Sequence, residues 1–93
     1  MTSQEVREEL LKHIEDGIDV RFTSFPKFKD DAEVYLSYST KEEGDFMKKK
    51  AIMDGLAKML TDNGYVIKIT TVEICKSMSI PYHQTLLAEK KGE

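Results

Sequence analysis

Few residues in this sequence could carry out nucleophilic chemistry. Cys75 is the single cysteine, and His83 follows it eight residues later. A reactive thiol needs a base within hydrogen-bond reach and a further group that orients the base. The spacing of Cys75 and His83 does not require the two side chains to meet. Cys75 also stands among the apolar residues Val72, Ile74 and Met78, so we expect it to be a small core residue. We therefore predict no enzyme activity, with a thiol enzyme centred on Cys75 and His83 as a rival hypothesis.

Metal and phosphate sites are not indicated either. His13, Cys75 and His83 are widely separated and lack the paired spacing of zinc ligands. Asp30 and Asp31 lack the alternating ligands and central glycine of a calcium loop. The glycines are scattered, so no phosphate-binding loop is visible. We expect no cofactor.

One segment has the composition of a recognition loop. In residues 25–29, two phenylalanines alternate with two lysines around a proline. Exposed rings could anchor in a protein groove or stack on bases, and the lysines could contact acidic groups. The alternative is that the rings fold back over the sheet edge. We include this loop in the predicted partner-binding surface, as Phe25, Lys27, Phe28, Lys29, Asp30 and Asp31.

Charge is unevenly distributed along the chain. The net charge is −3, yet residues 1–46 carry twelve acids and six bases, whereas residues 47–93 carry five acids and eight bases. The acidic half could present carboxylates to a basic groove, and the lysine-rich half could bind phosphates. Both could equally be solvated faces. The predicted acidic contacts are Glu5, Glu8, Glu9, Glu15 and Asp16, and the alternative nucleic-acid contacts are Lys48, Lys49, Lys50, Lys58 and Lys76.

Periodicity predicts the elements that position these residues in the first half of the chain. Thr2 and Glu5 fit a capping box, and the four-residue spacing that continues to Ile14 predicts a helix to about Asp16, stopped by Gly17. Alternating apolar residues then predict two antiparallel strands. The inward sets are Ile18, Val20 and Phe22 in one strand and Val34, Leu36 and Tyr38 in the other.

A second helix is predicted next, with two alternative starts. Either Thr40 or Asp45 could be its N-cap, and Asn63 with Gly64 could end it, since both tolerate the left-handed conformation. Its predicted apolar face consists of Phe46, Met53, Leu56 and Leu60.

The last third of the chain is less clearly patterned. Residues 65–70 are rich in β-branched side chains and predict a third strand, which we expect to be the most buried. Residues 71–78 could prolong that strand or form a short helix. Pro81 fits the first turn of a final helix that carries Tyr82, Leu86 and Leu87.

Together these patterns predict an α+β fold: a small single-layer antiparallel sheet of about three strands packed against two helices, in the order αββαβα, with an extra short helix left open. At 93 residues we expect one domain spanning 1–93, frayed at 1–2 and 89–93. The single cysteine, and the lack of a secretory pattern or a membrane-spanning apolar run, favour the cytoplasm.

The leading functional hypothesis is a small non-enzymatic protein that docks on a larger intracellular protein and regulates or inhibits it. A viral or mobile-element inhibitor of a nucleic-acid-processing enzyme would fit the acidic first half. The alternative is a nucleic-acid-binding regulator that uses the lysine-rich half. A homodimer through the third strand or the final helix is left open.

Overall fold

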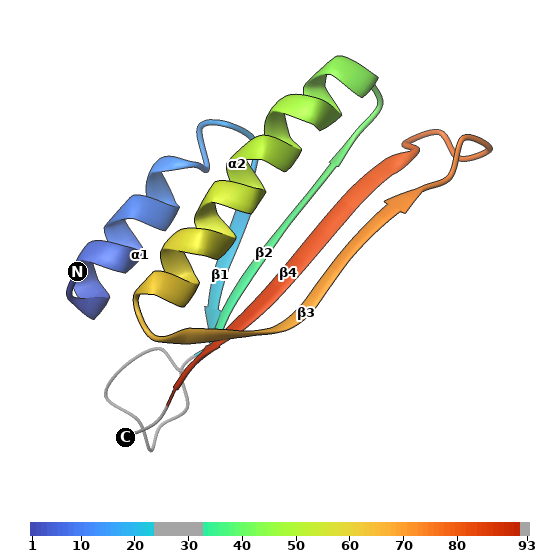
Figure 1. Cartoon of the computed structure of the whole chain (residues 1–93). Helices are drawn as coiled ribbons and strands as arrows, with labels where there is room; N and C mark the ends of the chain where they lie inside the picture. Colours follow the sequence, from blue (N-terminus) through green and yellow to red (C-terminus); the bar gives the residue numbers. More distant parts are fainter. Residues whose placement is uncertain (24–32, 92–93) are drawn as a thin grey trace.

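The fold consists of two helices on one face of a four-stranded sheet (Figure 1). The computed structural model describes residues 1–23 and 33–91. All strand pairs are antiparallel, in the spatial order β1-β2-β4-β3. The predicted α+β class is confirmed, whereas the order is αββαββ, with one more strand than expected. The elements are α1 (Ser3–Lys12), β1 (Asp19–Thr23), β2 (Glu33–Thr40), α2 (Glu43–Asp62), β3 (Tyr65–Ile74) and β4 (Tyr82–Lys90).

The first helix begins at the predicted capping box. The Thr2 hydroxyl accepts a hydrogen bond from the Glu5 backbone N–H, and the Glu5 carboxylate accepts one from the Thr2 N–H. α1 ends at Lys12, earlier than predicted, because the chain turns at His13 and the Ile18 N–H donates to the His13 carbonyl. Ile14 is consequently exposed, and its predicted place on the buried stripe was wrong.

The α1 helix is joined to β1 by apolar and cationic contacts. Val6 and Leu10 are buried in the core. The Arg7 guanidinium carbon lies 4.6 Å from the centroid of the Phe22 ring, a cation–π distance. Gly17 ends the connecting turn with a φ of 85°, which an L side chain rarely adopts. The predicted stop at Gly17 therefore belongs to the turn and not to the helix itself.

The two predicted strands pair as expected. Val20 lies opposite Leu36 and Phe22 opposite Val34, so the alternating apolar sets share the helix-bearing face. Val34 and Leu36 are buried, and Val20 and Phe22 pack against the core. The alternation therefore identified both the strands and their inward face.

The second helix begins at neither of the predicted caps. Its N-cap is Glu42, whose side chain makes no capping bond. The Thr40 hydroxyl instead donates to Asp45 Oδ2 at 2.6 Å, so the two predicted caps bond to each other across the start of the helix. The apolar face is confirmed, since Phe46, Met53, Leu56 and Leu60 are buried. The predicted end is confirmed by Asn63 as C-cap and by Gly64, whose φ is 87°.

The last third of the chain differs most from the prediction. Residues 71–74 prolong β3, and the expected final helix is instead strand β4, which lies between β2 and β3. Its inward residues Tyr82, Gln84, Leu86 and Ala88 are all buried. The prediction that β3 would be the most buried strand was wrong, because β3 is an edge strand whose residues are exposed from Lys68 onward.

The position of α2 explains this exposure. α2 lies over β2 and β4 and contacts only part of β3, which diverges from the helix toward Ile74 (Figure 1). The register of β3 against β4 also shifts between Ile67 and Ile69, where Lys68 forms a bulge. β3 beyond the bulge is therefore held by β4 on one side and covered by neither helix.

Tyr38 and Gln84 form a polar pair that is buried in the core. The Tyr38 hydroxyl donates to Gln84 Oε1 at 2.6 Å, joining β2 to β4 beneath α2. Burial, with smaller effects of Asp54 and Asp45, raises the pKa of Tyr38 to about 12, so the hydroxyl keeps its proton at neutral pH. Within the described residues, every buried side-chain nitrogen and oxygen atom has a hydrogen-bond partner.

The ends of the described chain are tied to the sheet and helices. Thr2 caps α1 and β4 extends to Lys90, while the predicted fraying of residues 1–2 and 89–93 stays a prediction, with 92–93 outside the described residues. The Lys91 N–H donates to the Gly64 carbonyl at 2.9 Å, and Lys90 Nζ donates to Ser3 Oγ. Neither described helix is long and apolar enough to cross a membrane.

The core assignment makes a stability prediction. Met53→Ala should lower the free energy of unfolding by about 2–5 kcal/mol, because the side chain is fully buried between α2 and the sheet. Met47→Ala is the matched control on the same helix: it removes the same group from an exposed position and should change stability by less than about 0.5 kcal/mol. Urea denaturation measures both, and equal losses would contradict the packing described.

The glycines of α2 and of its C-terminal turn should respond in opposite directions. Gly64→Ala should destabilise by about 1 kcal/mol, because its φ of 87° is costly for any residue with a Cβ. Gly55→Ala should stabilise by up to about 1 kcal/mol, because Gly55 is in the helix interior with nothing within 4 Å of an added Cβ. Thermal unfolding of the two variants checks the sign of each change.

Candidate functional site

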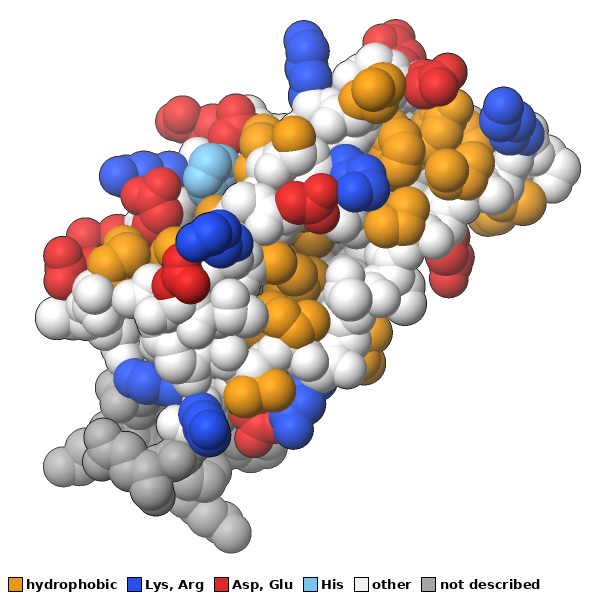
Figure 2. Space-filling view, in the orientation of Figure 1, with side chains coloured by type: hydrophobic (Ala, Val, Ile, Leu, Met, Phe, Trp, Pro, Cys, Tyr) orange, Lys and Arg blue, Asp and Glu red, His pale blue; other side chains and the backbone are white. Residues whose placement is uncertain are grey.

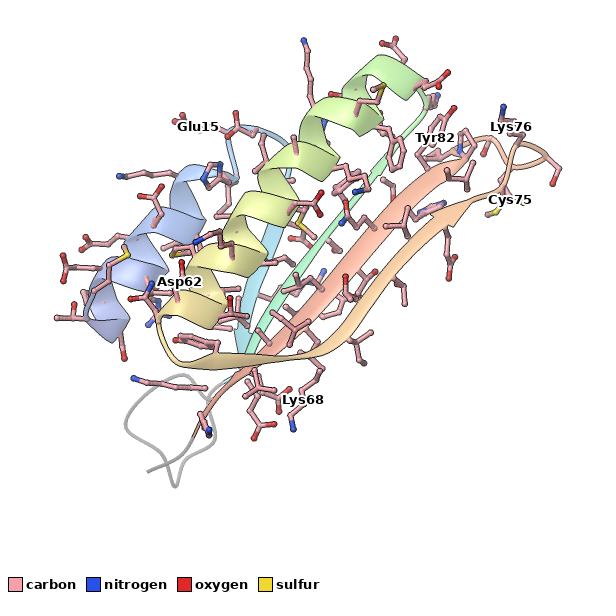
Figure 3. All side chains as sticks on the ribbon, in the orientation of Figure 1. Glu15, Asp62, Lys68, Cys75, Lys76 and Tyr82 are labelled. Carbon is pink, nitrogen blue, oxygen red and sulfur yellow. The ribbon has the colours of Figure 1, made fainter. Side chains whose placement is uncertain are left out.

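Most of the acidic side chains predicted as partner contacts on α1 and the turn after it bond to neighbouring residues of the same segment. Glu5 is held in the capping box, where the Thr2 N–H and hydroxyl lower the pKa of its carboxyl. Glu8 accepts a hydrogen bond from Gln4 at 3.2 Å. Glu9 pairs with Lys12 at 3.1 Å, and His13 donates to Asp16 at 2.8 Å. Glu15 is exposed in the connection between α1 and β1 (Figure 3).

The predicted lysine surface is not a single basic patch. Along α2, Lys49 pairs with Asp45 at 2.5 Å, Lys50 with Asp54 at 2.9 Å and Lys58 with Asp62 at 2.7 Å. These bonds lower the pKa of Asp45 and raise that of Lys58. α2 contains four lysines and also four acids, which are Glu43, Asp45, Asp54 and Asp62.

Lys76 lies apart from that helix. It is at the tip of the β3–β4 connection, beside Cys75 (Figure 3). Acidic and basic side chains are intermixed over α1 and α2 in the space-filling view (Figure 2). The structure therefore does not bring the alternative nucleic-acid contacts together. The predicted loop contacts Phe25, Lys27, Phe28, Lys29, Asp30 and Asp31 lie outside the described residues.

Cys75 is exposed, so the prediction that it would be a core residue was wrong. It directly follows β3, where its N–H donates to the Pro81 carbonyl at 2.8 Å. Its Sγ lies 3.2 Å from Ser77 Oγ. Hydrogen bonds from the Ser77 side chain and then its backbone N–H lower the pKa of the thiol. Cys75 is therefore an accessible, mildly acidified thiol at the hairpin tip.

His83 does not serve as a base for this thiol, because both of its ring nitrogens have other neighbours. Nε2 lies 2.7 Å from the Ile80 carbonyl, which can only accept, so Nε2 donates. Nδ1 lies 2.7 Å from Ser39 Oγ on the neighbouring strand. The predicted rival, a thiol enzyme built on Cys75 and His83, gains no support from this geometry.

The bond between Ser39 and His83 was not foreseen from the sequence. A hydroxyl, an imidazole and an orienting carbonyl resemble a nucleophile with its base. Acyl transfer also needs N–H donors aimed at the developing oxyanion, and here the backbone groups of the paired strands β2 and β4 are directed at each other. We assign the contact a structural role: it ties the β3–β4 connection to β2.

The feature that sequence reasoning missed is an apolar surface at the end of the hairpin. We name it the apolar corner and define it as Val72, Ile74, Met78 and Ile80, whose exposed fractions are 43%, 53%, 54% and 37%. Val72 and Ile74 lie opposite the buried residues Gln84 and Tyr82, so they are on the helix-bearing face of the sheet.

The apolar corner lies where α2 no longer covers the sheet. Tyr82 stacks on Phe46 of α2, with ring centroids 4.8 Å apart, and this pair marks the limit of the core. Beyond it, hydrophobic side chains gather on the surface over the end of β3 and β4 (Figure 2). The β-branched composition of β3 was the available signal, but we interpreted it as burial and not as an exposed apolar surface.

The described residues contain no group of three or more His, Cys, Asp or Glu side chains arranged to hold a metal ion. Comparisons with protein-family models, curated proteins and solved structures give no significant match.

The exposure of Cys75 predicts how the thiol reacts. Alkylation by iodoacetamide should proceed in the folded protein at a rate similar to that of an unfolded chain, and Ser77→Ala should move the midpoint of its pH profile upward. The sign follows because the hydrogen bond of the Ser77 hydroxyl favours the thiolate, and the variant loses that bond while it keeps the one from the backbone N–H. Modification that occurs only upon unfolding, or an unchanged profile in the variant, would contradict the description.

Proposed function

We propose that this chain is a non-enzymatic binding protein that docks on a larger protein and regulates or inhibits it, with the apolar corner at the centre of the contact. The supporting observation is the concentration of exposed apolar side chains. Among the described residues, ten large apolar side chains are exposed, and six of them lie in β3 and the connection after it. Four of the six form the apolar corner, whereas Val66 and Ile69 lie on the helix-free face of β3. Exposed apolar side chains gathered on one surface are typical of interaction sites.

The composition of the hairpin suits a protein groove. Aliphatic and methionine side chains at its centre can be desolvated at low cost, and methionine adapts to irregular pockets. The exposed polar residues of the β3–β4 connection, Lys76, Ser77 and Ser79, adjoin them in the chain and could form part of the solvated rim of an interface. The hairpin projects beyond α2, so a partner could enclose it without contacting the rest of the sheet (Figure 1).

In this proposal the acidic residues of α1 have a secondary role. Most of them already have a partner within α1 or the turn after it. New salt bridges between these carboxylates and a basic partner would therefore contribute little binding energy. Exposed carboxylates such as Glu8 and Glu15 can still steer a basic partner during approach. The paired lysines of α2 do not favour the nucleic-acid alternative.

The same features guide the proposed location. The exposed thiol of Cys75 has no cysteine in the sequence with which to form an internal disulfide. A reducing compartment would keep it in the thiol form, and we propose the cytoplasm.

The proposal predicts which surface captures a partner. A double change of Ile74→Ser and Met78→Ser should abolish affinity capture of the partner protein from nuclease-treated host lysate, because it removes exposed apolar groups without touching the core. Leu11→Ser with Ile14→Ser is the matched control, since it changes two apolar residues of comparable exposure on α1 and in the turn after it, and should leave capture intact. The proposal would be overturned if capture were lost on nuclease treatment, or if the Leu11→Ser, Ile14→Ser variant lost capture while the Ile74→Ser, Met78→Ser variant kept it.

A further inference from the structure

β3 offers a free sheet edge that differs from the other edge of the molecule. In the order β1-β2-β4-β3, the outer strands are β1 and β3. β1 has five residues, whereas β3 has ten, and within residues 1–23 and 33–91 no strand pairs with the outer side of β3. Edge strands present unpaired backbone N–H and C=O groups that can pair with another chain.

Edge strands are commonly protected by charges, prolines and bulges, and in β3 the bulge lies toward one end, with one charge in each half of the strand. The bulge and Lys68 lie in the first half of the strand. The following residues, 69–74, have the sequence Ile-Thr-Thr-Val-Glu-Ile, which is rich in β-branched residues and lacks proline. This half of the edge is therefore both exposed and well suited to sheet pairing.

The two charges of β3 are arranged so that the edge complements itself. The Lys68 ammonium lies 3.7 Å from the Glu89 carboxylate, which is on the helix-free face of β4. Glu73 lies opposite His83 and occupies the same helix-free face as Thr71. Lys68 and Glu73 are thus on one face, with opposite charges on either side of Thr71. Reversal of the strand direction brings each charge next to its opposite.

We propose that the outer edge of β3 pairs antiparallel with the same edge of a second copy, with Thr71 at the two-fold axis. Ile69 of one copy then lies opposite Glu73 of the other, and Lys68, which precedes Ile69 on the same face, lies beside that carboxylate. The pair occurs twice because the interface is isologous. Paired residues share a face, as an antiparallel ladder requires.

This dimer forms one continuous sheet through both copies. The two-fold axis of an antiparallel strand pair is perpendicular to the sheet, so both α2 helices lie on the same side. The helix-bearing residues Val72 and Ile74 of both copies then lie on that side too, so the dimer presents two apolar corners on one surface. The proposal goes beyond the proposed function and does not depend on it, because it is tested on the purified protein alone.

The charge pattern permits a test by complementation in trans. Sedimentation equilibrium of the wild-type protein should show a monomer–dimer equilibrium up to millimolar concentration. Lys68→Glu and Glu73→Lys should each weaken dimerisation by about tenfold or more, because each places like charges at both contacts. An equimolar mixture of the two variants should dimerise about as well as the wild type, since each contact then joins a glutamate to a lysine.

Two controls separate this interface from general charge and folding effects. Lys12→Glu reverses another lysine that pairs with a glutamate, on α1, and should leave dimerisation unchanged. The second control uses the wild-type protein alone. Its backbone amides in residues 69–74 should exchange hydrogen more slowly as the protein concentration rises, while those of β1 should not. A wild type that stays monomeric, a mixture no tighter than either variant, or protection confined to other elements would overturn the proposal.

Discussion

The sheet depends on the pairing of β4 with both of its neighbours. β4 is the last described strand in the sequence, yet it lies between β2 and β3 and is antiparallel to each. Its inward residues Leu86 and Ala88 lie fully within the core, and its Gln84 bonds to Tyr38 beneath α2. Since β3 pairs with no other described strand, the N-terminal strands and the hairpin form one sheet only through β4.

This arrangement explains why the hairpin is exposed. A single helix of 20 residues is the main cover of the sheet, and it packs over the two central strands with Met53, Leu56 and Leu60. A helix with its side chains is about 10–12 Å wide, whereas four strands about 4.8 Å apart form a wider surface. α1 covers the side of β1 (Figure 1), so the far end of β3 is left without a helix. The exposed hairpin is a geometric consequence of two helices on a four-stranded sheet.

The sequence predicted the first two thirds of the fold because each element there has one clear periodicity. Val34, Leu36 and Tyr38 alternate without interruption, and the apolar face of α2 repeats at helical spacing. β4 was missed because a polar residue, Gln84, occupies a buried position and Leu87 follows Leu86 directly. Gln84 can be buried only because Tyr38, far away in the sequence, satisfies its oxygen. Such a long-range hydrogen bond leaves no local pattern.

The same limit applies to the candidate site, because linear charge does not predict surface charge. The lysines at 48–50 and 58 stand out in the sequence, but helical geometry places acids four residues from three of them and pairs them. In α1 and the turn after it, Glu8 accepts a hydrogen bond from Gln4, Glu9 pairs with Lys12 and Asp16 bonds to His13. Because many of the charged side chains already have partners nearby, the exposed surface without such partners is apolar. Val72 and Ile74 gain nothing from contact with water and would gain from burial, at roughly 25 cal/mol per Å² of apolar area. The uncovered end of β3, and not the charged helices that the sequence suggested, is therefore the surface that would gain most from contact with a partner.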